Sequence, residues 1–350
     1  MRKRRSTQAD VAALAHVSPA IVSLVINGHM DGNVRISAQT RQRVWDAIRE
    51  LGYVANPVAR KLAGSQNRLL GVFTYQAIFP LEYHDFYYPF LIGIEEEAQA
   101  QDYDLLLFTR PTTNGKRSIY KEGINSLQMA DGALLLGVYQ GPDEITQLMQ
   151  EGYPFVYVGR RDIPGMNIPY VAADYVAATV QVVEYMHSLG HRRIAYLSKQ
   201  DRIPYEAHYD RQSGYLLAHQ RLEMVLDERL LIACDLEAIT PALLQQYLSL
   251  GVTALLFEDI SYAHKLLNVT KQMGMSVPHD LSFALLGDPL NETQHLTGMT
   301  GFSIPRREMG KEAVHLLINL LQGNNSLKGQ QLTLPCTFMK GNTVMPPTHL

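Results

Sequence analysis

The sequence predicts a small all-α head joined through a short hinge to an α/β core of two doubly wound parallel-sheet lobes. In residues 1–68, apolar residues recur at helical spacing between strong capping signals. Beyond them, short continuous apolar runs alternate with longer helical patterns, which is typical of parallel sheets covered on both faces. A chain of 350 residues is also long enough for two or three domains.

Charge is unevenly distributed along the chain, whose net charge is −3. Residues 1–68 hold 11 Lys and Arg against four acidic residues, a net charge of +7. The rest of the chain holds 20 basic and 30 acidic residues, a net charge of −10. A basic head on an acidic body indicates that only the head meets a polyanion. The alternative is a solvated basic tail, but the positive residues extend well past the first five.

The overall composition is that of a folded globular chain, with 46% hydrophobic and 19% charged residues. Two isolated cysteines, Cys234 and Cys336, cannot form a disulfide framework or a paired metal-ligand motif, so we expect a reducing, cytoplasmic location. The basic residues at the start precede polar residues, which argues against a signal peptide. No uncharged apolar stretch is long enough to span a membrane.

Two short helices are expected at the start of the head. Thr7 and Asp10 form a capping-box pattern for a helix over Gln8–Ala15, with Asp in place of the usual Glu. Ser18 is a good N-cap and Pro19 a good first residue for a second helix that ends near residue 27. Two short helices joined by a tight turn form the helix-turn-helix arrangement.

A third helix and a very short fourth one follow in the head. Ser37 is the expected N-cap of a helix over 38–51. Trp45, the only tryptophan, lies on this helix, where we expect it to pack against the core; contact with a ligand is the alternative. A helix of about two turns is predicted after Asn56. Because so short a helix is marginal alone in water, it should order only against another surface.

The core is expected to contain at least seven strands and four helices. Apolar runs predict strands over 69–73, 103–108, 132–136, 154–158, 193–197, 254–257 and 282–286. Helical patterns occupy stretches that include 90–101, 175–189, 211–221 and 261–273. Ligands of such sheets bind outside the carboxyl ends of the strands, so a cleft between the two halves is the expected site.

Short segments of the head occur together in a specific order: Asp10-Val-Ala-Ala-Leu-Ala15, Val17-Ser18, Val22-Ser23, Asn27-Gly28, Thr40-Arg41, 47–53 and 56–62. In these segments the chain resembles the LacI/GalR family of bacterial transcription regulators. The resemblance continues through nearly the whole chain, for example at Arg160, at Asp174 and at Arg211-x-x-Gly-Tyr215.

The resemblance implies a helix-turn-helix DNA-binding domain over residues 1–55, a hinge helix and linker over 56–68, and an effector-binding and dimerisation core over 69–350. The core would be periplasmic-binding-protein-like. Its N-lobe would comprise about residues 69–173 and 302–335, and its C-lobe about 174–301 and 336–350. The chain would cross between the lobes near Asp174, Phe302 and Pro335.

DNA contacts are implied by the same resemblance. Pro19, Ala20 and Leu24 depart from the polar residues and the arginine that the family often has there. Apolar side chains cannot make the bidentate contact to guanine but can touch a thymine methyl, so we expect fewer bases to be read by hydrogen bonds. Leu62 would be the wedge in the minor groove, and packing against the core is the alternative for this residue. The implied DNA-binding residues are Thr7, Ser18, Pro19, Ala20, Ser23, Leu24, Asn27, Asn56, Ala59 and Leu62.

Effector contacts are likewise implied in the cleft. Arg211 can make forked hydrogen bonds to vicinal hydroxyls or a carboxylate, and Asp259 can accept bonds from two sugar hydroxyls. Asp288 stands in Leu285-Leu-Gly-Asp288, where the family has Gly-Phe-Asp-Asp, so it either substitutes for the usual contact or that contact is lost. The implied effector-binding residues are Phe86, Tyr87, Arg160, Arg211, Asp259 and Asp288; ordinary core packing is the alternative for the two aromatic residues.

The sequence therefore predicts a DNA-binding transcription regulator, expected to be a repressor, that acts as a homodimer on double-stranded operator DNA. Its effector would be a small ligand, a sugar or related polyol, with a nucleobase or nucleoside as the other option. Because common catalytic motifs are missing, we expect neither an enzyme nor a cofactor nor a metal. The alternative is a non-regulatory binding or catalytic α/β protein with an incidental basic N-terminus. The sequence leaves open whether effector releases or promotes DNA binding.

Overall fold

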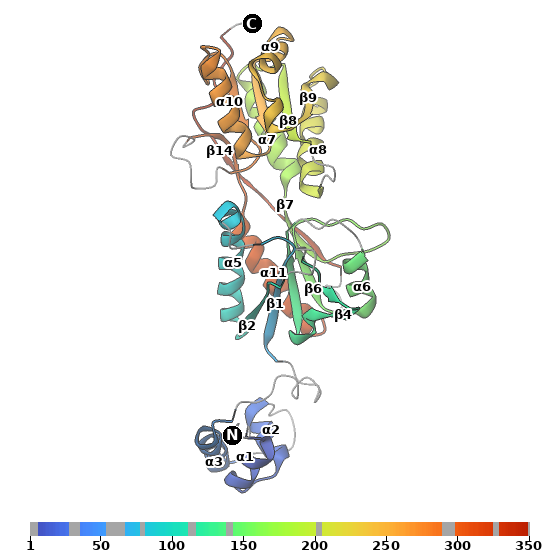
Figure 1. Ribbon diagram of the computed structural model, residues 1–350, viewed down its shortest axis with the longest axis vertical. Coiled ribbons are helices and arrows are strands. Elements are labelled where there is room, and N and C mark those ends of the chain that lie inside the picture. Colours follow the sequence, from blue (N-terminus) through green and yellow to red (C-terminus); the bar gives the residue numbers. More distant parts are fainter. Residues whose placement is uncertain are drawn as a thin grey trace. The chain divides into compact units, whose positions relative to one another are not determined.

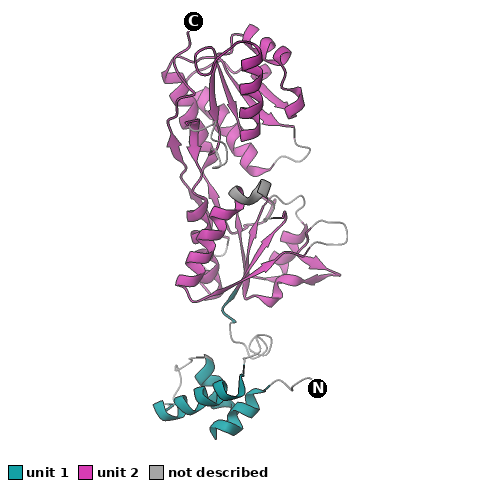
Figure 2. Cartoon of the chain, turned by 60° about the vertical axis from the view of Figure 1, so that its left-hand side comes forward, with its two compact units in different colours: residues 1–69 teal, residues 70–350 magenta. Residues whose placement is uncertain are grey.

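The computed structural model describes residues 6–27, 36–53, 67–77, 81–110, 117–137, 143–200, 205–288, 298–324 and 329–348. The chain divides into two compact units, residues 1–69 and 70–350 (Figure 2). The predicted hinge residues Asn56, Ala59 and Leu62 lie outside the described residues.

Three helices form the described part of the head: α1 (Gln8–Ala15), α2 (Pro19–Asn27) and α3 (Ala38–Leu51). The predicted capping box is confirmed, since the backbone N–H of Asp10 donates to the hydroxyl of Thr7 and the backbone N–H of Thr7 donates to the carboxylate of Asp10. His16 ends α1 in the left-handed conformation, at φ 54° and ψ 48°, where a non-glycine residue carries modest strain.

The core of the head is formed by small apolar side chains, chiefly Val11, Val22 and Val44. The prediction that Trp45 packs against this core was wrong, because its side chain is 41% exposed. Successive residues of a helix are turned by about 100°, so the burial of Val44 directs the next side chain away from the core.

The described residues of the N-lobe form a six-stranded sheet and the helices that pack with it (Figure 1). In spatial order its strands are β13 (Gln331–Leu334), β7 (Tyr170–Ala173), β6 (Phe155–Val158), β5 (Gly132–Leu136), β1 (Leu69–Thr74) and β2 (Asp104–Phe108). The pairs from β13 to β1 are parallel. Helices α5 (Leu81–Ala100) and α11 (Arg306–Leu321) pack against each other, and α6 (Asp143–Glu151) contributes to a separate apolar cluster. A small hairpin, β3 (Tyr120–Lys121) and β4 (Ile124–Asn125), completes this lobe.

The C-lobe repeats this plan with a second six-stranded sheet. Its spatial order is β14 (Thr337–Met339), β12 (Thr300–Ser303), β11 (Ser282–Leu285), β10 (Ala254–Phe257), β8 (Ile194–Lys199) and β9 (Leu231–Cys234). Only the β12–β14 pair is antiparallel. The accompanying helices are α7 (Tyr175–Ser188), α8 (Glu206–Arg221), α9 (Pro241–Ser249) and α10 (Ile260–Gln272). The predicted fold class, an all-α head and a core of two parallel-sheet lobes, is confirmed.

The chain passes between the lobes at three places, from β7 to α7, from β12 to α11 and from β13 to β14. The first and third passages are joined, since the backbone N–H of Asp174 donates to the carbonyl of Leu334 over 2.8 Å. The carboxylate of Asp174 accepts the N–H of Ala177 over 2.9 Å and caps α7. Asp174 therefore has a structural role at the boundary of the lobes.

Two glycines allow α5 and α11 to approach each other closely in the N-lobe. A Cβ atom added to Gly93 would lie 1.9 Å from the carbonyl oxygen of Arg307, and one added to Gly310 would lie 2.4 Å from that of Phe90. This contact fixes the start of α11, which carries Arg306, beside the aromatic residues of α5.

Among the described residues, no single helix is long and apolar enough to cross a membrane. Only α1 and α2 taken together, across a bend of 103°, reach that length and composition. Within the same residues, no group of three or more His, Cys, Asp and Glu is placed to hold a metal ion.

Replacement of Gly93 by alanine should destabilise the core. The added methyl group would meet backbone, which cannot rotate away as a side chain can, and over-packing of this kind costs about 1–3 kcal/mol or more. We expect a lower melting temperature for Gly93→Ala in calorimetry. The control is Gly287→Ala, whose Cβ would have its nearest neighbour at 4.0 Å. Equal melting temperatures for the two variants would contradict the packing described.

Candidate functional site

The first turn of α2 presents a surface in the head. Ser18, Pro19 and Ala20 are exposed, and Ser23 and Leu24 are half-buried. The turn is held against α1 by a hydrogen bond from the side-chain amide of Gln8 to the carbonyl of Pro19, over 3.1 Å. An exposed N-terminal turn on a second helix is the part of a helix-turn-helix that reaches base edges. The side chain of Asn27 lies outside the described part of the structure, and the exposed Thr7 uses its hydroxyl in the cap of α1.

A pocket lies in the C-lobe, where β8 and β10 end. This is the edge at which open α/β sheets bind ligands. Of the predicted effector residues, only Asp259 lines it. The complete lining is Leu197, Lys199, Tyr205, His208, Glu258, Asp259 and Tyr262. A wider surface hollow between α9 and α10 has no buried charged side chain, so we place the candidate site at the strand ends; that hollow is lined by Ile239, Thr240, Pro241, Lys265, Asn268, Val269, Lys271 and Gln272.

Glu258 is the polar centre of the strand-end pocket. Its side chain is only 8% exposed, and its Oε1 accepts hydrogen bonds from Nδ1 of His208, over 2.7 Å, and from the hydroxyl of Tyr196. Burial raises the pKa of the neighbouring Tyr205 to about 12, so this phenol remains a donor at neutral pH. Sequence reasoning assigned no effector contact to Glu258, Tyr205 or His208, although the position of Glu258 directly after an apolar run was a signal.

Arg211 is buried in the C-lobe, with 6% of its surface exposed. Its Nε donates to the carbonyl of Leu286 over 2.7 Å and its Nη1 to that of Ala207 over 2.9 Å. Its guanidinium carbon lies 4.0 Å from the centre of the Tyr175 ring. The guanidinium is therefore held rigidly by groups of its own lobe.

The two predicted aromatic residues of α5 have different surroundings. Tyr87 is 3% exposed and donates its hydroxyl hydrogen to Gln76 over 2.7 Å, so it belongs to the N-lobe core. Phe86 is 39% exposed, and the centre of its ring lies 5.3 Å from the guanidinium carbon of Arg306. Only Phe86 presents substantial surface to a ligand.

Asp259 caps α10. Its Oδ1 accepts the backbone N–H of Ser261 over 2.8 Å and the hydroxyl of the same residue over 2.7 Å. Asp288 has a partner from the other lobe, because both its oxygens lie 2.6 Å from Nη1 of Arg306. While it caps the helix, Asp259 still lines the pocket, whereas the carboxylate of Asp288 is already paired with Arg306.

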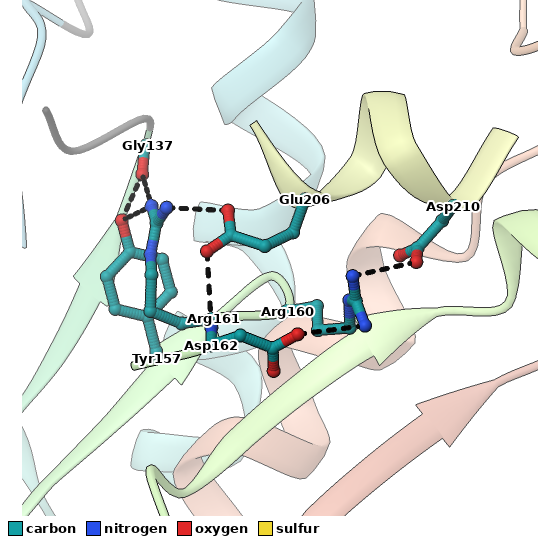
Figure 3. Close-up of polar contacts among 7 residues, drawn as sticks. All are labelled: Gly137, Tyr157, Arg160, Arg161, Asp162, Glu206 and Asp210. Atoms are coloured by element: carbon teal, nitrogen blue, oxygen red, sulfur yellow. Dashed lines mark hydrogen bonds and ion pairs between the residues drawn. The ribbon is translucent and has the colours of Figure 1, made fainter. Parts of the chain in front are cut away.

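Residues that follow β6 meet the start of α8 across the lobe boundary (Figure 3). Nη1 of Arg160 lies 3.0 Å from Oδ2 of Asp162, and Nη2 of Arg160 lies 3.1 Å from Oδ1 of Asp210. Arg161 pairs with Glu206 over 2.7 Å. The predicted effector residue Arg160 thus has carboxylate partners within the protein, one of them on the C-lobe.

Comparison with known proteins identifies both parts of the chain. Residues 7–56 match the bacterial regulatory proteins of the lacI family, and residues 183–344 match the periplasmic binding protein-like domain. The HTH-type transcriptional repressor CytR of Escherichia coli (strain K12) is 30% identical over 344 residues, which cover 97% of this chain and 96% of CytR. The chain belongs to the lacI family.

Other lacI-family proteins agree along the whole length. The HTH-type transcriptional regulator CelR of Thermobifida fusca is 29% identical over 334 residues, 93% of this chain and 94% of CelR. A solved CelR–cellobiose complex is 25% identical with a TM-score of 0.64, covering 97% of this chain and all of that one. A lac repressor dimer bound to operator and an anti-inducer, at 24% identity, shares the fold with a TM-score of 0.71 over 98% of this chain and 100% of that one. The resemblance found in the sequence is confirmed.

The stability of this lacI-family protein should depend on the ionisation of Asp210. Burial raises the pKa of Asp210 from 3.8 to about 6, although Arg160 partly opposes the shift. The folded chain therefore binds this proton more tightly than the unfolded chain, so the contribution of Asp210 to folding free energy becomes less favourable as pH rises from about 4 to 6. Relative to the parent, Asp210→Asn should gain melting temperature between pH 4.5 and pH 7.

The control for this prediction is Asp227→Asn. Hydrogen bonds from Arg229 and Arg193 lower the pKa of Asp227, so its ionisation changes little in that pH range. A constant difference in melting temperature between Asp210→Asn and the parent at both pH values would contradict the raised pKa.

Proposed function

We propose that this lacI-family protein is a transcriptional repressor that binds operator DNA as a homodimer and is controlled by a small effector held between the lobes of its core. The single observation that carries the proposal is that one chain joins a head matching the lacI family to a core with a polar pocket at its strand ends. The alternative, a non-regulatory α/β protein with an incidental basic N-terminus, does not account for the matched head.

On the DNA side, the proposal assigns base reading to the exposed turn of α2. The apolar Pro19, Ala20 and Leu24 would contact thymine methyl groups, and Ser18 and Ser23 would supply the few polar contacts. Thr7, Asn27, Asn56 and Ala59 are proposed to contact the duplex as well, with Leu62 as the wedge that bends it. The division into a head over 1–55 and a hinge over 56–68 is part of this proposal.

On the effector side, the proposal assigns direct contacts to Phe86, Arg211, Asp259 and Glu258. The nearly buried carboxylate of Glu258, the exposed carboxylate of Asp259 and a fixed guanidinium are suited to a sugar or related polyol, whose hydroxyls both donate and accept hydrogen bonds. A nucleoside, with its sugar hydroxyls and flat base, is the other class to test. We assign Arg160 and Asp288 to contacts between the lobes, and Tyr87 to packing beneath Phe86.

Because lacI-family members are DNA-binding regulators, we propose binding without catalysis. We also place the protein in the cytoplasm, where bacterial DNA lies.

DNA binding should require two half-sites. Each head offers one short reading helix, so two heads related by a two-fold axis should bind a near-palindromic operator far more tightly than a single half-site. After selection of an operator from random duplexes, gel shift with one and with two half-sites, combined with analytical ultracentrifugation, measures this. A monomer that binds one half-site as tightly as the full site would refute the dimeric proposal.

Effector binding should depend on Glu258 and Asp259. A thermal-shift screen against sugars and nucleosides finds the effector, because a ligand that binds only the folded state raises its stability. Calorimetry with that ligand should then show affinity weakened by roughly 10- to 100-fold in Glu258→Gln and Asp259→Ala, since a lost hydrogen bond to a charged group costs about 1.5–3 kcal/mol. Operator affinity without effector should be unchanged. Unchanged effector affinity in both variants would refute the assigned pocket.

A further inference from the structure

We propose that Arg161 and Glu206 form a latch that holds the two lobes closed without effector, and that this latch sets operator affinity in the effector-free state. The link to operator affinity rests on the function proposed above. The closure itself rests on contacts within the core unit alone.

Both oxygens of the Glu206 carboxylate are bound by the N-lobe (Figure 3). Oε2 lies 2.7 Å from Nη1 of Arg161, and Oε1 accepts the backbone N–H of Asp162 over 3.2 Å. Glu206 is the first residue of α8 in the C-lobe, whereas Arg161 follows β6 in the N-lobe. This pair therefore breaks when the lobes separate.

Contacts within the N-lobe hold the side chain of Arg161 in place. Its guanidinium carbon lies 4.4 Å from the centre of the Tyr157 ring, and its Nη2 donates to the carbonyl of Gly137 over 3.2 Å and to the hydroxyl of Tyr157. Gly137 has a φ of +94°, and a Cβ there would lie 2.2 Å from the side chain of Gln76 and 2.6 Å from that of Tyr87. Because the Tyr157 ring and the Gly137 carbonyl already hold the guanidinium of Arg161, little side-chain freedom remains to be lost when Glu206 docks.

Burial makes the pair act differently from an ion pair on the surface. The side chains of Arg161 and Glu206 are only 10% and 16% exposed, whereas pairs in open solvent contribute about 0–1 kcal/mol. Loss of one partner leaves the other charge buried in the closed state, but hydrated in the open state. Removal of either charge should therefore raise the free energy of the closed state and leave that of the open state unchanged.

The first turns of α8 connect this latch to the proposed effector pocket. Glu206 and Asp210, one turn apart, face Arg161 and Arg160 of the N-lobe. Tyr205, immediately before the helix, and His208, between the two acids, line the pocket at the strand ends. A ligand that displaces α8 by contact with His208 must also displace Glu206, since one rigid helix carries both residues.

The test uses the full chain with Arg161→Gln, Glu206→Gln and the double variant. Spin labels at Ile124→Cys in the N-lobe and Val225→Cys in the C-lobe, two side chains that are 68% and 82% exposed, report the lobe distance by double electron–electron resonance. Cys336→Ser removes the more accessible native cysteine. The control is Arg193→Gln, which breaks a pair of the same 2.7 Å length inside the C-lobe, where Arg229 still holds Asp227.

Without effector, each single latch variant should lengthen the distance between the labels and change operator affinity by at least about fivefold, within the usual range of coupling between sites. The double variant should open no further than either single one, because the two charges act as a unit. Arg193→Gln should change neither quantity.

Unchanged distances, or additive effects of the two substitutions, would overturn the latch. Longer distances with unchanged operator affinity would overturn its control of DNA binding. A parent chain that binds no operator refutes the proposed function, and the distances still test the latch.

Discussion

The core depends on the fact that neither lobe is built from one continuous segment. Helix α11 and strand β13, near the end of the chain, complete the N-lobe, and β14 returns to the C-lobe. Movement between the lobes is thereby confined to three short passages, two of which are joined by the hydrogen bond between Asp174 and Leu334. A core of this design can change the angle between its lobes without unfolding either of them, which suits a protein that converts ligand binding into movement.

Charge is arranged in a complementary way across the lobe boundary. Arg160, Arg161 and Arg306 of the N-lobe pair with Asp210, Glu206 and Asp288 of the C-lobe. These pairs occupy two of the positions where the family resemblance placed effector contacts. In this lacI-family protein the arrangement of the two lobes is therefore stabilised by ion pairs within the chain itself, and we propose that an effector adds to them or competes with them.

Local structure could be predicted where the signal is local. The capping residues Thr7 and Ser37 set the starts of two head helices, and short continuous apolar runs predicted seven of the strands. Strands β7 and β13 were not predicted. Strand β7 is followed after one residue by the apolar start of α7, so its run does not stand apart from the helical pattern. Strand β13 lies at the edge of its sheet and alternates polar with apolar residues, so it has no continuous apolar run. The start of α5 was placed nine residues late, and the different burial of Phe86 and Tyr87 follows from their place on that helix. The partners of Arg160 and Asp288 could not be predicted, since no pattern in the sequence records which charges of two lobes meet.

We propose that ligand binding in the core and DNA binding by the head are linked through one conformational equilibrium. The direct measurement is a complete linkage cycle, in which operator affinity is titrated with and without saturating effector, and effector affinity with and without saturating operator. Linkage requires the same factor in both directions, and we expect a factor of about 5 to 150. Effector affinity that is identical for the free and the operator-bound protein would contradict the claim.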